Sequence, residues 1–296
     1  MRLLRLASLL FLVAHPLSAQ RVGLIVVAHG ADSTWNASVR QTVNEVRWTA
    51  GPVKLAFLMG SEATTASWDN AVVALQNDGV ERIVAVPFMV STHGSHVRQV
   101  EFFAGIRKEL PTELRAMMGG HDHAAHVPAR VPVTVTGALD NAPELGEALA
   151  ARWNSLDASD RKRPLMLIAH GPNATEDARL WERDLTDVSG DLARRLAPHP
   201  VRVGLLRDDA GEAIRSQSVR EFREMIATMS AEAKDSVLVM PVLISTGAIN
   251  YQKLPADIEG LPVRYSPVGL TPSTALARWV ERIALESLHS TQTHQH

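Results

Sequence analysis

The stretch "RVGLIVVAHG", residues 21–30, decides the fold, because it is a continuous apolar run that ends in glycine. A strand buried on both faces of a parallel sheet has this pattern, since neither of its faces meets water. The stretch "PLMLIAHG", residues 164–171, repeats it. We therefore predict two equivalent buried strands, each of which ends in a His-Gly pair.

Outward from these two stretches, apolar runs alternate with segments of helical periodicity. Further strands are predicted at 53–60, 81–90 and 131–139, and again at 201–208, 236–246 and 261–270. Apolar residues at helical spacing separate them; Val100, Phe103, Ile106 and Leu110, for example, predict one helix. Alternating strands and helices indicate right-handed βαβ units and a parallel α/β sheet.

The order of these segments repeats along the chain, which predicts a duplicated α/β unit. "VLVMPVLISTGAI" (237–249) resembles "ERIVAVPFMVSTHGSHV" (81–97), although it has no histidine. We place the first lobe at 21–158 and the second at 159–290. Residues 117–130, with His121, His123 and His126, fit no element and could capture a metal ion or be only a solvated loop, and 291–296 is expected to be a disordered tail.

Three histidines follow predicted strands of the first lobe. His29 ends the first strand, and His93 and His96 follow the third. Ligands of open parallel sheets bind at the carboxyl ends of strands, and neutral imidazole is both a metal ligand and a base. The alternative is that each histidine is a turn residue satisfied by the backbone; the clustering favours a functional site.

Several other kinds of site do not fit. The residues after Gly30, "ADSTWN", have no glycine spacing for a nucleotide, and no G-x-S-x-G nucleophile turn occurs. Ala28 stands where the Arg-His-Gly motif of a histidine phosphatase needs arginine. The formal charge of −2 does not suggest a nucleic-acid partner.

In order and spacing, "VAHGADSTWNASV", "VKLAFL" and "GVERIVAVPFMVSTHGSHV" resemble the class II chelatases, the CbiX and SirB group. These enzymes insert cobalt or iron into sirohydrochlorin. The family motifs correspond here to His29-Gly30, Pro87 and Gly94-Ser95-His96, and the resemblance extends over nearly the whole chain after residue 20. It implies two α/β lobes, each a parallel sheet flanked by helices, with a cleft between them.

The resemblance also implies roles for the histidines. His29 and His96 would bind the incoming divalent metal, Co²⁺, Fe²⁺ or Ni²⁺, and take protons from the macrocycle. His93 is either an additional, more exposed entry ligand or a turn residue. No nucleotide cofactor is expected, and the partner is a tetrapyrrole.

The chain departs from the family pattern in two ways. Met59 stands where the family usually has an acidic residue, with Glu62 as a possible substitute. In the second lobe His170 remains, but Ile249 takes the place of His96, so one metal site per chain is expected. His170 either reaches the cleft or is an inherited strand-end residue, and Arg98, Arg207 and His170 are candidates for binding the substrate carboxylates.

The first nineteen residues predict a secretory signal. Arg2 and Arg5 precede a short apolar run, and Ala19 offers a small-residue cleavage site. The alternative, an uncleaved anchor, would need an apolar run of about 20 residues. We expect an exported protein, periplasmic or secreted, without stable membrane insertion after cleavage. It has no cysteine, so any transition metal would be held by histidine and carboxylate.

The sequence therefore predicts a chelatase-like lyase that inserts Co²⁺ or Fe²⁺ into a sirohydrochlorin-type tetrapyrrole, as in cobalamin biosynthesis. The predicted export is unusual for such an enzyme. The first alternative is an exported, non-catalytic carrier of metal or tetrapyrrole on the same fold. A weaker one is a hydrolase with a metal-bound water at His29 and His96.

Overall fold

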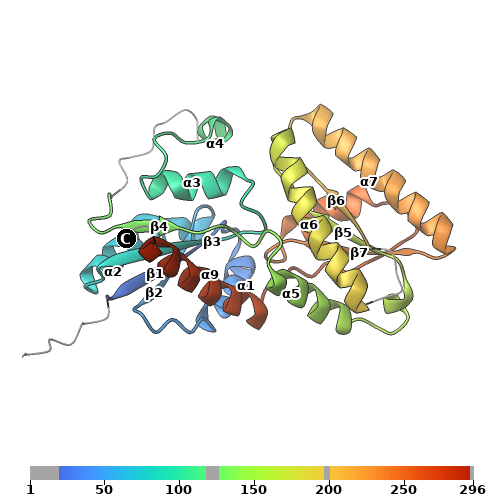
Figure 1. The fold of residues 1–296 in the computed structure, drawn as a ribbon. Coiled ribbons are helices and arrows are strands. Elements are labelled where there is room, and N and C mark those ends of the chain that lie inside the picture. Colours follow the sequence, from blue (N-terminus) through green and yellow to red (C-terminus); the bar gives the residue numbers. More distant parts are fainter. Residues whose placement is uncertain (1–19, 118–126, 197–200, 294–296) are drawn as a thin grey trace, which may run out of the picture.

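Two parallel four-stranded sheets form the centres of two lobes that lie side by side (Figure 1). The computed structural model describes residues 20–117, 127–196 and 201–293. The strand order is β2-β1-β3-β4 in the first sheet and β6-β5-β7-β8 in the second. The two orders are equivalent, which confirms the predicted α/β fold with two similar lobes.

The first sheet has one face covered by α1 and the other by α2 and α3. Alternate residues of β1 face opposite sides, so Leu24 and Val26 pack with Trp35 of α1, whereas Ile25 and Val27 pack with Val72 of α2. All of β1 is buried, as its apolar run predicts. The elements are β1 (Val22–Ala28), α1 (Ser33–Asn44), β2 (Val53–Phe57), α2 (Trp68–Asn77), β3 (Arg82–Phe88), α3 (Ser95–Phe103), α4 (Thr112–Met117) and β4 (Val133–Val135), with a short 3₁₀ turn at Ser61–Thr64.

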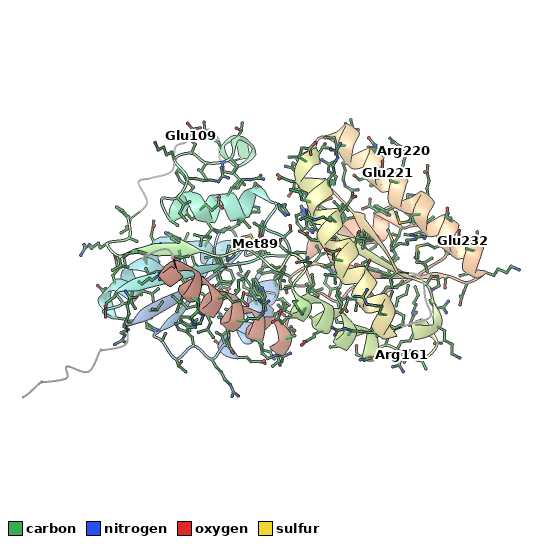
Figure 2. The ribbon with its side chains drawn as sticks, viewed as in Figure 1. Met89, Glu109, Arg161, Arg220, Glu221 and Glu232 are labelled. Atoms are coloured by element: carbon green, nitrogen blue, oxygen red, sulfur yellow. The ribbon has the colours of Figure 1, made fainter. Side chains whose placement is uncertain are left out.

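The second sheet repeats this arrangement. Leu165 and Leu167 of β5 pack with α6, and Met166 and Ile168 pack with Phe222 of α7 on the opposite face. Figure 2 shows Arg220, Glu221 and Glu232 along α7, at the outer edge of this lobe. The elements are β5 (Leu165–Ala169), α6 (Thr175–Leu196), β6 (Val201–Leu205), α7 (Glu212–Ala233), β7 (Val237–Val242), α8 (Leu254–Asp257) and β8 (Val263–Tyr265), with a 3₁₀ turn at Asp160–Lys162 and a π-helical turn at Ile249–Lys253.

The last helix of each half packs against the other half. Helix α5 (Pro143–Asn154) follows β4 of the first sheet but lies against α6, and Arg152 donates to the Pro241 carbonyl in β7 at 2.7 Å. Helix α9 (Thr274–Thr293) follows β8 but lies on the first sheet (Figure 1). There the ring centroids of Trp279 and Phe88 are 6.0 Å apart. Residues of both lobes therefore share one apolar cluster. The boundary at 158 and 159 stays a prediction.

Two local expectations differ from the structure. The helix predicted through Leu110 ends at Phe103, because Gly105 adopts a positive φ of 75°, and Ile106 beyond it is exposed. The fourth strand of each sheet pairs over only three residues. Among the described residues, no helix is both long enough and apolar enough to cross a bilayer.

Candidate functional site

His29 and His170 occupy equivalent places, directly after the central strands β1 and β5. Each precedes a glycine in the left-handed region, Gly30 with φ 85° and Gly171 with φ 75°. At Gly30 a Cβ atom would also lie 2.3 Å from the Met59 carbonyl oxygen, so only glycine fits there. The two His-Gly turns are therefore the same structure, present once in each lobe.

Backbone hydrogen bonds establish which residues face these turns. The Met59 N–H donates to the His29 carbonyl at 2.8 Å, and the Arg207 N–H donates to the His170 carbonyl at 2.6 Å. Met59 and Arg207 are thus structural counterparts, as the sequence repeat indicated. Glu62 does not lie free beside the site, because Asn36 donates to its carboxylate at 3.0 Å and Arg40 pairs with it.

The structure brings His29 and His96 together. Their ring centroids are 4.7 Å apart, with the planes inclined at 81°. His29 comes from the carboxyl end of β1, and His96 lies in the first turn of α3, just after β3, the strand that pairs with β1. Neighbouring parallel strands thus bring two imidazoles from distant parts of the sequence to one point.

Hydrogen bonds fix the tautomer of both rings. His29 Nδ1 lies 2.7 Å from the Gly30 carbonyl oxygen, which only accepts, so Nδ1 carries the proton. His96 Nδ1 likewise lies 3.0 Å from Oε1 of buried Gln99. In the neutral form each ring therefore keeps its lone pair on Nε2, the atom that a metal or a proton would bind.

Burial keeps both rings neutral. Desolvation lowers the pKa of His29 below its usual 6.5, although the Gly30 carbonyl opposes the shift. Desolvation, together with the nearby His29, lowers the pKa of His96 to about 4. At neutral pH the pair is thus unprotonated and available as a ligand set.

The second lobe contributes a different pair to the same region. His170 Nε2 lies 3.3 Å from Asp209 Oδ2, and the charges of both residues act on His96. Although burial opposes it, the hydrogen bond and charge of Asp209 raise the pKa of His170, and the hydrogen bond from His170 lowers the pKa of Asp209 to about 2. His170 is therefore the partner of a carboxylate and close enough to His96 for their charges to interact, while a role of His170 in the cleft stays a prediction.

Asp209 is a residue that the sequence did not single out for a role. The expected acid at Met59 is missing from the first lobe, and the structure has a carboxylate, Asp209, extending from the other lobe instead. A useful signal was present, because Asp208 and Asp209 follow the counterpart of Met59. The spacing of residues along the sequence does not show which residues of the two lobes lie close together.

The Ser-Thr pairs at 91–92 and 245–246 have the same structural role in the two lobes. Thr92 accepts from the Ala138 N–H at 2.8 Å, and Thr246 accepts from the Gly269 N–H at 2.8 Å. In both lobes the threonine joins the third strand to the segment that follows the fourth. The shared residues maintain the loop, while the histidines distinguish the first lobe.

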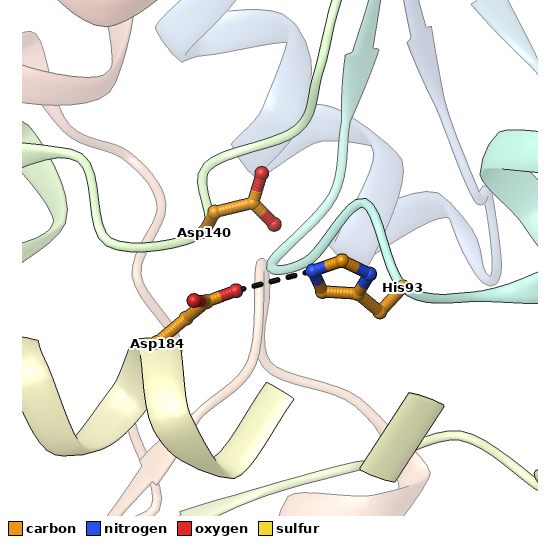
Figure 3. Close-up of side chains that lie close together, drawn as sticks. All are labelled: His93, Asp140 and Asp184. Carbon is orange, nitrogen blue, oxygen red and sulfur yellow. Dashed lines mark ion pairs between the residues drawn. The ribbon is translucent and has the colours of Figure 1, made fainter. Parts of the chain in front are cut away.

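His93 lies in a separate group from His29 and His96. It faces Asp184 of α6, with 3.4 Å between its Nε2 and Asp184 Oδ2, and Asp140 lies beside the pair (Figure 3). The predicted entry ligand thus belongs to a group that links the two lobes.

Both candidate arginines have partners within the protein. Arg98 Nη2 lies 2.6 Å from Asp177 Oδ1, which joins α3 to α6 across the lobes. Arg207 donates to the Pro172 and Asn173 carbonyls at 3.1 and 2.5 Å. Their roles in substrate binding stay predictions. The predicted signal at 1–19, the histidines at 121, 123 and 126, and residues 294–296 of the predicted tail lie outside the described residues. The prediction of a disordered tail from 291 onward is wrong for residues 291–293, which form the end of α9.

Two lobes of parallel α/β structure, with paired histidines at the strand ends facing each other, define a chelatase-like protein. Residues 23–156 match the model of the CbiX family. Comparison with curated proteins found no match.

Solved structures extend the likeness to both lobes. SirB from Bacillus subtilis, solved with Fe³⁺, has a TM-score of 0.64 at 15% identity, over 93% of this chain and 98% of SirB. DR2241 from Deinococcus radiodurans, a multi-domain protein with structural similarity to chelatases, has a TM-score of 0.51 at 16% identity, over 90% of this chain and 54% of DR2241. At these identities the comparisons establish the fold.

Proposed function

We propose that this protein inserts a divalent metal ion, Co²⁺ or Fe²⁺, into a sirohydrochlorin-type tetrapyrrole. One observation carries the proposal. The His29 and His96 rings lie 4.7 Å apart, and hydrogen bonds at Nδ1 leave both Nε2 lone pairs available. Two neutral imidazoles bind a first-row metal firmly enough to capture it and leave positions open for the macrocycle nitrogens.

The insertion step also releases two pyrrole protons. We propose that solvent receives both, because neither His96 nor His170 suits as their acceptor. His96 has a pKa of about 4, and His170 has no free lone pair, since its Nδ1 faces the Gly171 carbonyl and its Nε2 faces the Asp209 carboxylate. On this proposal His29 and His96 hold the metal, and the paired charges of His170 and Asp209 act on His96.

The alternative function is an exported carrier of metal or tetrapyrrole. The predicted signal at residues 1–19 favours it, because chelatases of cobalamin and sirohaem synthesis normally meet their substrate in the cytoplasm. A periplasmic or secreted location is therefore part of our proposal for either function. The carrier would use the same neutral imidazoles without turnover.

Absorption spectroscopy separates these functions. The chain is incubated with sirohydrochlorin and Co²⁺, Fe²⁺ or Ni²⁺, and conversion of the free to the metallated spectrum is followed. A chelatase gives a rate above the uncatalysed control, and His96→Ala lowers that rate by about 100-fold or more. His289→Gln, at an exposed position on α9, serves as the matched histidine control. A bound chromophore without turnover indicates the carrier, and a rate equal to the control refutes catalysis.

A further inference from the structure

Helix α6 of the second lobe presents a row of carboxylates to the first lobe. Asp177 pairs with Arg98 at 2.6 Å, and Asp187 accepts from Asn141 Nδ2 at 3.2 Å. Between them lies Asp184, which is buried, with 6% of its side chain exposed. Asp177 and Asp187 thus meet a cation or an amide donor of the first lobe, as acidic groups at an interface usually do.

Asp184 meets a different set of groups. It faces the His93 ring, and the carboxylate of Asp140 lies in the same group; one ligand atom from each residue lies within 4.8 Å of the others (Figure 3). Two carboxylates this close repel each other, the more so where one is buried. The distance from His93 Nε2 to Asp184 Oδ2, 3.4 Å, exceeds the usual N–H···O range of 2.7–3.2 Å. The arrangement thus concentrates negative charge around an imidazole.

Nearby positive charge offsets only part of this repulsion. Arg183 donates to Asp184 Oδ1 at 3.0 Å, but 63% of its side chain is exposed, so solvent screens its charge. Both hydrogen bonds of Arg183 to this carboxylate go to Oδ1, whereas Oδ2 is the oxygen that faces His93. One oxygen of Asp184 is therefore directed at the group.

Hydrogen bonds from Thr92 hold the carboxylate of Asp140 in position. It accepts from the Thr92 N–H and the Thr92 hydroxyl, both at 2.6 Å. Such hydrogen bonds orient metal-binding carboxylates in proteins. Asp140 itself adopts φ 48°, a left-handed conformation that non-glycine residues adopt rarely. The first lobe thus positions His93 and Asp140 on two adjacent loops.

The spacing of the three groups suits a metal ion. In a tetrahedral site with bonds of about 2.1 Å, neighbouring ligand atoms lie about 3.4 Å apart. The His93–Asp184 distance already has this value, and a carboxylate oxygen of Asp140 lies within 4.8 Å of both ligand atoms. One imidazole with two carboxylates suits first-row divalent ions such as Zn²⁺, Co²⁺ and Mn²⁺ better than Mg²⁺ or Ca²⁺.

The other histidine–carboxylate group shows the contrast. Asp208 lies near His170 and Asp209, but Arg215 pairs with it at 3.2 Å and Lys253 also pairs with it. Two cations of the protein already compensate that carboxylate. In the part of the chain that the structure describes, the group at His93 lacks such a pair of cations and has the exposed Arg183 instead.

We propose that His93, Asp140 and Asp184 bind a first-row divalent metal ion between the lobes, at a site separate from the His29–His96 pair. Two ligands come from the first lobe and one from α6 of the second, so the bound ion joins the lobes. Its role is structural: it fixes the position of α6 beside the cleft. The metal that is inserted into the tetrapyrrole would bind elsewhere, at His29 and His96.

Metal counting tests the proposal. Co²⁺ alone is the probe, and calorimetry with visible absorption is the readout. All variants are made in a chain whose histidines at 121, 123, 126, 294 and 296 are replaced by alanine, so that these residues do not contribute. We expect about two Co²⁺ per chain, falling to about one in Asp184→Asn and to about one in His96→Ala. In the double variant no specific Co²⁺ remains.

Two further variants make the result decisive. His93→Gln, at a more exposed position, should weaken the same Co²⁺ site by about 100-fold or more, even if Asp184→Asn folds poorly. Asp187→Asn removes a charge one turn along α6 and should leave both sites intact. An unchanged Co²⁺ count in Asp184→Asn and His93→Gln overturns the proposal, as does loss in His93→Gln alone, which would indicate adventitious surface binding. Loss in His96→Ala is independent, so the proposed function is judged separately.

Discussion

The pKa of His96 links the candidate site to the stability of the fold. The folded chain holds this pKa at about 4, chiefly by burial, whereas a histidine of an unfolded chain titrates near 6.5. Between these values the unfolded chain binds a proton that the folded chain does not. Stability therefore falls as the pH decreases from about 6.5 toward 4, by on the order of 3 kcal/mol from this residue.

The measurement is urea unfolding at pH 7 and pH 4.5, with EDTA present so that metal does not contribute. His96→Gln has no titrating group and should lose clearly less stability between the two pH values than the unmodified chain. Carboxylate titration affects both chains alike and cancels in the comparison. His289→Gln, which replaces an exposed histidine, should behave like the unmodified chain. Equal losses in all three chains would mean that His96 is not desolvated in the fold.

At the scale of elements, α5 and α9 each pack against the half of the chain to which they do not belong in sequence. One side chain of α9 therefore contributes strongly to the stability of the whole fold. Trp279 of α9 is fully buried against the sheet of the first lobe, beside Phe88 of β3. We expect Trp279→Ala to destabilise the protein by about 3–5 kcal/mol, because it leaves a large cavity between lobe and helix. Leu285→Ala on the same helix should cost much less, since 47% of that side chain is exposed. Urea midpoints of the two variants test this; similar midpoints would contradict the packing.

The elements also show how far the sequence can predict this structure. Apolar runs located all the central strands, and strand ends located His29 and His96, because both depend on local pattern. The partners of α5 and α9 could not be predicted in this way, since an apolar stripe fits either sheet. The same reason applies to Asp209 and to the Asp184 partner of His93. Each of these contacts depends on how the two lobes are arranged, and the periodicity of apolar residues gives no information on that arrangement.

The edge strands illustrate the same limit on a smaller scale. The sequence predicts strands at 131–139 and 261–270, but β4 and β8 pair over three residues each. The Thr136 N–H still donates to the Ala85 carbonyl of β3 at 3.0 Å, but the Ala138 N–H donates to the Thr92 hydroxyl instead. The apolar composition of 131–139 and 261–270 is typical of strands, but hydrogen bonds from the loop after the third strand determine where pairing ends.

At the scale of the whole molecule, the two lobes should unfold as one unit. One apolar cluster includes residues of both sheets, and Arg282 of α9 holds Glu144 of α5 through two hydrogen bonds of 2.7 and 2.8 Å. A fragment of residues 20–158 would keep the first sheet but lose α9, and α5 would lose α6, against which it packs. Both apolar faces would then meet water, which few folds of this size tolerate.

We therefore expect the fragment 20–158 to bind the hydrophobic dye ANS and to unfold without a cooperative transition. Mixing it during refolding with a fragment of residues 159–293 should restore a cooperative transition, because α5 and α9 regain their sheets. A fragment that exchanges the two helices, with residues 20–141 joined by a flexible linker to 274–293, provides the matched control. It keeps the first sheet together with its covering helix and should fold on its own. Cooperative unfolding of 20–158 alone would show that α9 is dispensable and that the lobes are independent.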